Sequence, residues 1–247
     1  MNHPGFVELR HHAGWALLRI ARADKRNALN RAARASLAAT LEALRGEVRA
    51  IVITGSEQSF CAGLDLKERE ADRATGRPDT AGEEWMDVNM AIREHPAVVI
   101  AAVNGAALGA GLTLVNSCDL AIAAHSATFG TPEIGFGTYA SMAGPTLQRS
   151  ALTRKRLAWM LLTAPHIDAL TAERWGMINE VTGDEVLLAR AAALAQQVAA
   201  YDPDALAEIK RTVDALPAQA GWREAMEYGQ TVNAAIRAQR LAGVARN

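Results

Sequence analysis

Hydrophobic positions in the first half of the chain fall into short continuous runs, separated by longer segments with helical spacing. Apolar runs of strand length, bounded by glycine or polar residues, are typical of buried β-strands. The predicted strands are residues 7–10, 15–20, 50–54, 97–103 and 119–123. The predicted helices between them are residues 31–44, which follow a possible N-cap at Asn30, and residues 109–116. This alternation predicts an α/β fold with mainly buried sheets.

The pattern changes beyond Ala143, where helical spacing dominates. The predicted helices are residues 154–162, 169–175, 186–201, 203–216 and 222–241. Asp168 or Thr171 can cap the second of these, and Asp202 precedes Pro203 at the first position of the fourth. We therefore expect an α/β body followed by a helical C-terminal region, which packs as a small subdomain or onto a neighbouring subunit.

Residues 67–84 fit neither pattern. They are highly charged, contain Gly76 and Pro78, and show no sustained apolar period. Long segments of this kind are often functional lids or disordered. We expect a disordered surface segment with some helix at each end.

The composition narrows the class of protein. Half of the 247 residues are hydrophobic, enough for a substantial core, and 26 Lys and Arg against 27 Asp and Glu give a net charge of −1. This balance disfavours nucleic acid as the main partner, because phosphate binding needs a basic excess. Cys61 and Cys118 form no CxxC pair, so we expect neither a metal site nor a disulfide framework. No apolar run reaches the ~18 residues of a membrane span, and the N-terminus lacks an apolar signal core, so we expect a cytoplasmic protein.

Two segments of small residues follow predicted strands and open into predicted helices. In residues 59–66 (SFCAGLDL), Gly63 allows a tight turn and a close approach of a ligand to the main chain. In residues 104–113 (NGAALGAGLT), small side chains leave the N–H of Ala110 accessible at the start of a helix. The Gly-x-Gly here lacks the full spacing and the downstream acid of a dinucleotide-binding site.

A third segment, residues 129–137 (FGTPEIGFG), places an acid among apolar neighbours. Desolvation there raises the pKa of Glu133 and suits this side chain to proton transfer near neutral pH. The chain has no GxSxG motif and no Ser/His/Asp arrangement, which argues against a serine hydrolase.

Taken together with residues 23–30 (ADKRNALN) and Cys118-Asp119, these segments resemble the crotonase superfamily, also called the enoyl-CoA hydratase/isomerase family. The resemblance covers nearly the whole chain. It implies a crotonase-like spiral of ββα units over residues 1–195. It also implies a helical oligomerisation region over residues 196–247, used to form a homotrimer or a hexamer built as a dimer of trimers.

The resemblance also implies an acyl-CoA thioester substrate, with coenzyme A present only as part of that substrate. The N–H groups of Leu64 and Ala110 would hold the thioester oxygen, and Glu133 would transfer a proton. The implied substrate and CoA contacts are Lys25 or Arg26 near the phosphates, Ala28, Ala62 and Leu66 along the groove, and Gly63, Asp65 and Thr113 around the turns. Asp65 more plausibly supports its turn than replaces a catalytic acid.

This chain departs from the family's hydratases at one position. Those enzymes use two glutamates, and the second would fall where this chain has Thr113. A hydroxyl can orient water but cannot serve as a carboxylate base at neutral pH. We therefore favour double-bond isomerisation over hydration, with a non-catalytic acyl-CoA-binding protein as the alternative. Tyr139 and Ser141 are candidates for the acyl pocket, and Lys210 is expected to be a solvated helix residue or a phosphate contact.

Overall fold

The computed structural model describes residues 6–150, 152–216 and 221–244. Its larger sheet has six strands in the order β1-β2-β3-β5-β7-β10. β1 is antiparallel to β2, and every other neighbouring pair is parallel. The strands are β1 (Val7–His12), β2 (Trp15–Ile20), β3 (Ala50–Gly55), β5 (Val98–Val103), β7 (Leu120–Ala124) and β10 (Glu180–Thr182). The five predicted strands are confirmed to within two residues at each end.

A smaller sheet of four three-residue strands has the order β4-β6-β8-β9. The strands are β4 (Ser59–Cys61), β6 (Ala106–Leu108), β8 (Thr128–Gly130) and β9 (His166–Asp168). The first three are parallel, and each follows a strand of the larger sheet and precedes a helical segment. This repeated ββα arrangement confirms the predicted fold class. Strands this short carry no readable periodicity, so the second sheet was not predicted.

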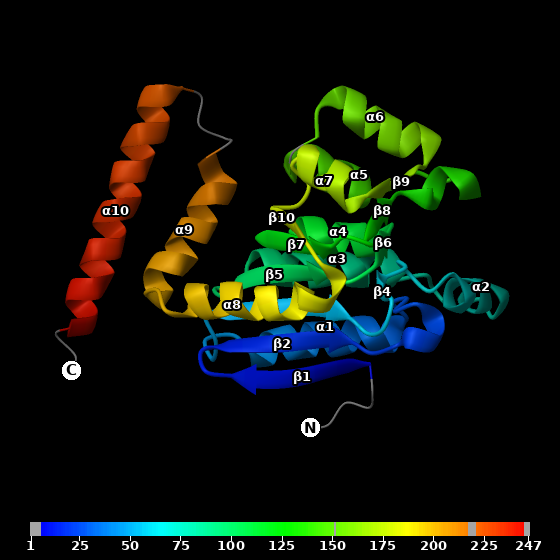
Figure 1. The fold of residues 1–247 in the computed structure, drawn as a ribbon, viewed down its shortest axis with the longest axis horizontal. Coiled ribbons are helices and arrows are strands. Elements are labelled where there is room, and N and C mark those ends of the chain that lie inside the picture. The colour runs from blue at the N-terminus through cyan, green and yellow to red at the C-terminus, as the bar shows by residue number, and fades with distance from the viewer. Residues whose placement is uncertain (1–5, 151, 217–220, 245–247) are drawn as a thin grey trace.

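Helices cover both faces of the larger sheet (Figure 1). Alternate residues of β3 show why, because Ile51 and Ile53 belong to one buried cluster and Val52 belongs to another. The first cluster includes side chains of α1 (Arg31–Ala43), α3 (Ala81–Arg93) and α4 (Ala110–Ser117), and the second includes those of α8 (Leu187–Ala199). The other helical segments of the body are η1 (Ala23–Lys25), α2 (Leu66–Ala74), η2 (Pro132–Phe136), α5 (Ala143–Ser150), α6 (Arg154–Thr163), α7 (Ala169–Arg174) and η3 (Asp184–Val186).

Predicted helix caps are confirmed at Asn30 and Asp168, and the predicted start of a helix at Pro203 is confirmed, with Asp202 as its cap. The side chains of Asn30, Asp168 and Asp202 accept hydrogen bonds from main-chain N–H groups in the first turns of α1, α7 and α9 (Pro203–Ala215). Of the two candidates for α7, the cap is Asp168 and not Thr171, whose N–H is the donor. These caps fix where each helix begins, because the first N–H groups of a helix have no partner within it.

The expectation of a disordered segment over residues 67–84 is wrong, although helix is present at both ends, in α2 and at the start of α3. Two arginines of α1 explain the order. Arg31 pairs with Asp72 and Glu84 at 3.1 and 3.2 Å, and buried Arg34 pairs with Glu68 and Glu84 at 3.4 and 2.8 Å. The charges that suggested solvation in the sequence therefore bind partners on a helix far away in the chain.

The C-terminal helices α9 and α10 (Trp222–Val244) pack on each other and stand beside the body in Figure 1. The predicted boundary at residue 195 falls inside α8, whose Val198 and Ala199 still pack on the larger sheet. Leu206 of α9 also packs on this cluster, so the place where the C-terminal region begins stays a prediction. Whether this region mediates oligomerisation stays a prediction.

Lys210 on α9 is neither solvated nor free to bind a phosphate, so both expectations for it are wrong. Its side chain is buried, and Nζ lies 2.9 Å from Asp119 Oδ2 and donates to the carbonyl oxygens of Ile92 and Ala97 at 2.9 and 3.1 Å. Burial lowers the pKa of Lys210, and Asp119 opposes this shift. The lysine thus fastens the C-terminal helices to the edge of the core.

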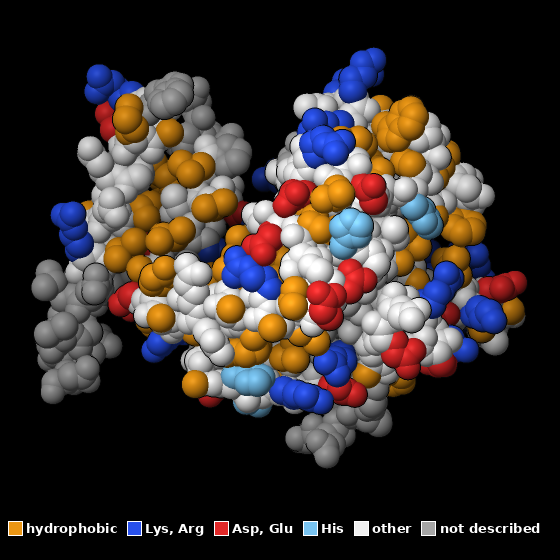
Figure 2. Space-filling view, viewed as in Figure 1, with side chains coloured by type: hydrophobic (Ala, Val, Ile, Leu, Met, Phe, Trp, Pro, Cys, Tyr) orange, Lys and Arg blue, Asp and Glu red, His pale blue; other side chains and the backbone are white. Residues whose placement is uncertain are grey.

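Hydrophobic side chains remain exposed on these helices, over both α9 and α10 (Figure 2). They include Ile209, Val213, Leu216 and Met226. Within the residues that the structure describes, no helix is both long and apolar enough to cross a membrane.

Candidate active site

The smaller sheet brings the three sequence motifs together. Cys61 of β4 pairs with Ala107 of β6, and Leu108 of β6 pairs with Gly130 of β8, all in parallel. Parallel strands end at the same edge of a sheet. The chain therefore leaves this edge three times, toward Leu64, Ala110 and Glu133.

Leu64 lies on a turn that is tied to the motif at residues 23–30. A parallel bridge joins Leu29 and Leu64, in which Leu29 N–H donates to Gly63 O at 2.8 Å and Asp65 N–H donates to Leu29 O at 3.2 Å. Successive N–H groups of an extended chain point to opposite sides. The bridge therefore uses the Gly63 carbonyl and the Asp65 N–H, and it leaves the Leu64 N–H pointing away from Leu29.

Ala110 is the first residue of α4, so its N–H has no partner within the helix. The two turns touch. A Cβ on Gly63 would lie 3.5 Å from Ala110 N, and a Cβ on Gly111 would lie 2.1 Å from Cys61 O. Glycine is therefore required at position 111, since a side chain there would push the turns apart. At position 63 the φ of +98° favours glycine.

Glu133 lies beside the Ala110 turn. It is half-buried in η2, and a Cβ on Gly109 would lie 2.9 Å from Glu133 Oε1. Glu133 Oε2 is buried and has no hydrogen-bond partner among the described residues. Burial raises the pKa of Glu133, as expected from its apolar neighbours. A carboxyl group in this state can both take and return a proton.

Thr113 occupies the first turn of α4 and is almost fully buried. Its hydroxyl donates to Gly109 O at 3.3 Å, and its N–H donates to the same oxygen at 3.0 Å. The hydroxyl is thus engaged with the main chain. No second carboxylate stands at this position on α4.

The predicted CoA-contacting residues lie close to one another, although they come from two distant motifs. Ala62 N–H donates to Arg26 O at 3.0 Å, which holds residues 25–28 against residues 62–66. Lys25 and Arg26 are exposed, and Ala28 and Ala62 are half-buried. Leu66 is 53 % exposed at the start of α2. Their arrangement is an open strip with basic side chains at one end, and contact with CoA stays a prediction.

Asp65 supports its turn, as expected. Its Oδ1 caps α2 by accepting from Glu68 N–H at 3.3 Å, and its Oδ2 lies 3.1 Å from Arg22 Nη2. Both carboxylate oxygens are engaged within the chain, and contact of Asp65 with a substrate stays a prediction. Arg22 and the fully buried Asn27, whose φ is +56°, were missed. The sequence signal for Asn27 was an asparagine in the middle of the motif at residues 23–30, because Asn tolerates the left-handed conformation that a tight turn needs.

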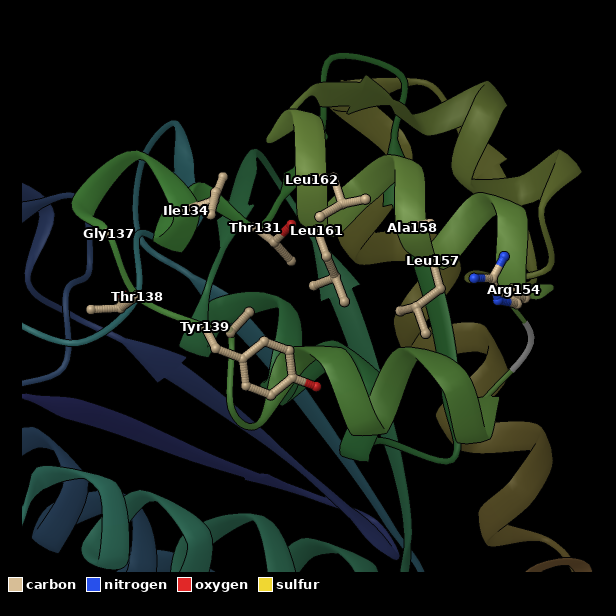
Figure 3. A pocket seen from close by; sticks show the side chains of 11 residues that line it. Thr131, Ile134, Gly137, Thr138, Tyr139, Arg154, Leu157, Ala158, Leu161 and Leu162 are labelled. Atoms are coloured by element: carbon tan, nitrogen blue, oxygen red, sulfur yellow. The ribbon is translucent and has the colours of Figure 1, made fainter.

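A mostly apolar cavity of about 490 Å³ lies between η2, the loop that follows it and α6 (Figure 3). Thr131 and Ile134, which flank Glu133 in the chain, line one side, and Leu157 and Leu161 of α6 line the other. Tyr139 also lines the cavity, whereas Ser141 does not. Such a lining suits a hydrocarbon group.

Other reactive groups are scattered over the described part of the chain. It contains no group of three His, Cys, Asp or Glu side chains that could hold a metal ion. Cys61 is fully buried beneath the Gly63 turn, and burial raises the pKa of its thiol to about 12. Glu133 and the N–H groups of Leu64 and Ala110 stay the predicted catalytic groups at this edge.

Comparison with known proteins places this arrangement in context. The chain is 36% identical over 173 residues to a probable mitochondrial enoyl-CoA hydratase of Dictyostelium discoideum, covering 68% of this chain and 60% of that protein. It is 32% identical to the 1,2-epoxyphenylacetyl-CoA isomerase of Escherichia coli K12, covering 81% and 79%. The crystal structure of human enoyl-CoA hydratase domain-containing protein 3 superposes with a TM-score of 0.86 at 28% identity, covering 93% of this chain and 90% of that one.

The family model for enoyl-CoA hydratase/isomerase matches residues 10–239, which include all three motifs at the edge of the smaller sheet. This match covers nearly the whole chain, and the repeated ββα units agree with it. The protein belongs to the enoyl-CoA hydratase/isomerase family of the crotonase superfamily.

Proposed function

We propose that this protein isomerises the double bond of an enoyl-CoA thioester, with Glu133 as the proton carrier. The observation that carries the proposal is a half-buried carboxylate with one unpartnered oxygen, packed against Gly109 beside two outward-facing N–H groups. No second carboxylate accompanies it on α4, where Thr113 stands.

In the proposed reaction, the thioester oxygen accepts hydrogen bonds from Leu64 N–H and Ala110 N–H. Glu133 removes a proton from the carbon next to the carbonyl of a 3-enoyl thioester, and the electron pair moves onto the oxygen as an enolate. The same carboxyl group then returns the proton to the far carbon of the former double bond, which yields the 2-enoyl thioester. Donors aimed at a developing oxyanion are worth about 2.7–4 kcal/mol each in the barrier.

Hydration is the second candidate, because several relatives are named enoyl-CoA hydratases. It needs one group to activate water and another to deliver a proton. Thr113 offers a hydroxyl that already donates to Gly109 O, and a hydroxyl cannot act as a base at neutral pH. Isomerisation needs a single acid, and this chain supplies one.

The deciding experiment compares the rates of 3-enoyl-CoA isomerisation and 2-enoyl-CoA hydration. Both reactions are monitored through the ultraviolet absorbance of the conjugated thioester. We expect isomerisation to be the faster reaction. Glu133→Gln should lower its kcat by roughly 10²–10⁴-fold, the usual contribution of a general acid–base group. Glu70→Gln on the exposed face of α2 is the matched control and should change nothing.

Retention of more than a tenth of the isomerase activity in Glu133→Gln would remove this residue from the mechanism. Tight binding of acyl-CoA by calorimetry, with no turnover of any enoyl-CoA, would instead favour the non-catalytic alternative. We also propose that the protein assembles as a homotrimer or hexamer through its C-terminal helices. The exposed apolar residues on α9 and α10 support this, and sedimentation equilibrium tests it.

A further inference from the structure

We propose that Arg22 and Asp65 form a clamp that positions the Leu64 N–H toward the thioester oxygen. The inference rests on the proposed function, since it assigns how one of the two oxyanion donors is held. Both are positioning residues, because neither needs to touch the substrate.

The main-chain hydrogen bonds of the Leu64 turn go to one neighbouring segment. Its main-chain bonds to that segment are the two of the Leu29 bridge and the bond from Ala62 N–H to Arg26 O. Residues 26 and 27 both adopt positive φ, at +50° and +56°. This segment is therefore irregular, and side chains must fix its shape.

The Arg22 guanidinium grips both segments at once. Nη1 donates to Ala28 O on the motif at residues 23–30, and Nη2 donates to Asp65 Oδ2, 3.1 Å away, on the turn itself. The two side chains are only 11% and 14% exposed. The guanidinium also lies over the ring of Phe6, and Arg22 N–H donates to Asn27 Oδ1. A rigid fork with two acceptors fixes distance and direction better than a single charge can.

Asp65 passes this constraint to the turn. One carboxylate oxygen accepts from Arg22 and the other caps α2. Asp65, which directly follows Leu64, is therefore held from two sides. Burial opposes ionisation of Asp65, but the Glu68 N–H and Arg22 outweigh it and hold the pKa below its usual value. The carboxylate is therefore charged throughout the neutral range.

Packing cannot replace the clamp on the downstream side. None of the nine residues of α2 is buried, and its contacts with α1 are polar. They are ion pairs and hydrogen bonds from the Arg31 N–H to the Glu68 carboxylate. Loosening the clamp should thus tilt the Leu64 peptide by a small angle without unfolding the core. Such a change weakens a bond that forms fully only in the transition state, so kcat should fall more than KM rises.

The test uses Asp65→Asn, which keeps a good N-cap but removes the charge, and Arg22→Lys, which keeps the charge but loses the fork. The matched control is Asp72→Asn. Asp72 forms an ion pair with Arg31, also at 3.1 Å and on the same helix, but away from the Leu64 turn. For each protein, kcat and KM are measured with 3-enoyl-CoA. The carbonyl stretch of bound, isotope-labelled butyryl-CoA is recorded by infrared difference spectroscopy.

We expect both clamp variants to lose about 10- to 100-fold in kcat, with KM changed by less than about threefold, as for a weakened oxyanion donor. The carbonyl stretch of bound butyryl-CoA should move back toward its value in water, whereas Asp72→Asn should match the wild type. The infrared signal comes only from folded protein with ligand bound, so a loss of stability does not imitate this result.

Two failures are distinguishable. If wild-type protein leaves the carbonyl stretch of butyryl-CoA at its aqueous value, the proposed function itself is wrong. If the wild type shifts the stretch and both clamp variants shift it equally with unchanged kcat, then the clamp is overturned while the function stands.

Discussion

The two turns that carry Leu64 and Ala110 are held by different forces. The Leu64 turn is held by the ion pair of its Asp65 with Arg22 and by hydrogen bonds to a neighbouring loop, and it leads into a helix with no buried residue. The Ala110 turn is wedged in the core. It leads into α4, where six of eight residues are buried, and Gly111 lies directly on Cys61 O.

This difference decides how each donor can be displaced. Packing resists compression steeply, so the Ala110 turn moves only when a neighbour is enlarged. An ion pair restrains direction more softly, so the Leu64 turn moves when charge or hydrogen-bond geometry changes. Volume changes should therefore act most strongly on the Ala110 turn and charge changes on the Leu64 turn.

The largest expected effect comes from Gly111→Ala. The added methyl would lie 2.1 Å from Cys61 O, so the two turns must separate. This separation would move the Ala110 N–H away from the Leu64 N–H, the other proposed donor. We expect kcat for isomerisation to fall about 100-fold, as when an oxyanion donor is lost. The free energy of unfolding should fall by about 1–3 kcal/mol from overpacking.

Gly229→Ala on α10 is the control for this substitution. Gly229 is also helical, and an added Cβ meets nothing within 4 Å. It should keep full activity and equal or greater stability in thermal unfolding, since alanine favours the helix. Full activity in Gly111→Ala would show that contact between the turns does not position the donor.

The pH dependence of kcat/KM should separate the turns next. Glu133 must be ionised to remove a proton, and burial raises its pKa above the ordinary 4.5. Activity is therefore present above the raised pKa and is lost as the pH falls through it. Asp65→Asn should lower the plateau of this profile without moving its acid limb.

Gly109→Ala should instead move the acid limb to higher pH, because the added methyl would lie 2.9 Å from Glu133 Oε1 and remove more water from the carboxylate. The plateau should fall as well, since the φ of +53° at Gly109 strains alanine directly before Ala110. The measurement is kcat/KM across the acid range for both variants. An equal shift in the two would show that the clamped turn also acts on the base, which would contradict the division drawn above.

The sequence predicted the parts of this molecule that local patterns determine. Strands of the larger sheet and helix starts depend on neighbouring residues. Asn30 as a cap and Pro203 as the first residue of a helix were identified from their neighbours alone. Glu133 was identified because apolar residues and a proline surround it. Its pairing with Gly109 could not be derived, because it depends on the register of two three-residue strands.

Long-range ion pairs account for the wrong expectations. Lys210 has an ordinary helical sequence around it, and only the fold brings Asp119 and two carbonyl oxygens within reach. The acids of residues 67–84 were interpreted as solvated, but in the fold several of them form ion pairs with Arg31 and Arg34 of α1. Arg22 was missed for the same reason, since its partner Asp65 is 43 positions away. The charged residues in a sequence therefore do not show which side chains will pair with one another in the fold.

The smallest expected effect tests whether side chains matter on the packed turn. Thr113→Val removes the hydroxyl but leaves the main-chain N–H at position 113, which still donates to Gly109 O. We expect isomerase kcat within about threefold of wild type, and an unfolding free energy lowered by about 0.5–1.5 kcal/mol for one lost hydrogen bond. Activity assays and urea unfolding provide both values. A loss of hydration tenfold greater than the loss of isomerisation would mean that the hydroxyl orients water. In that case the Ala110 turn would depend on a polar side chain, as the Leu64 turn does. The contrast between a turn held by packing and a turn held by charge would then fail at Thr113, where this chain departs from the two-glutamate hydratases.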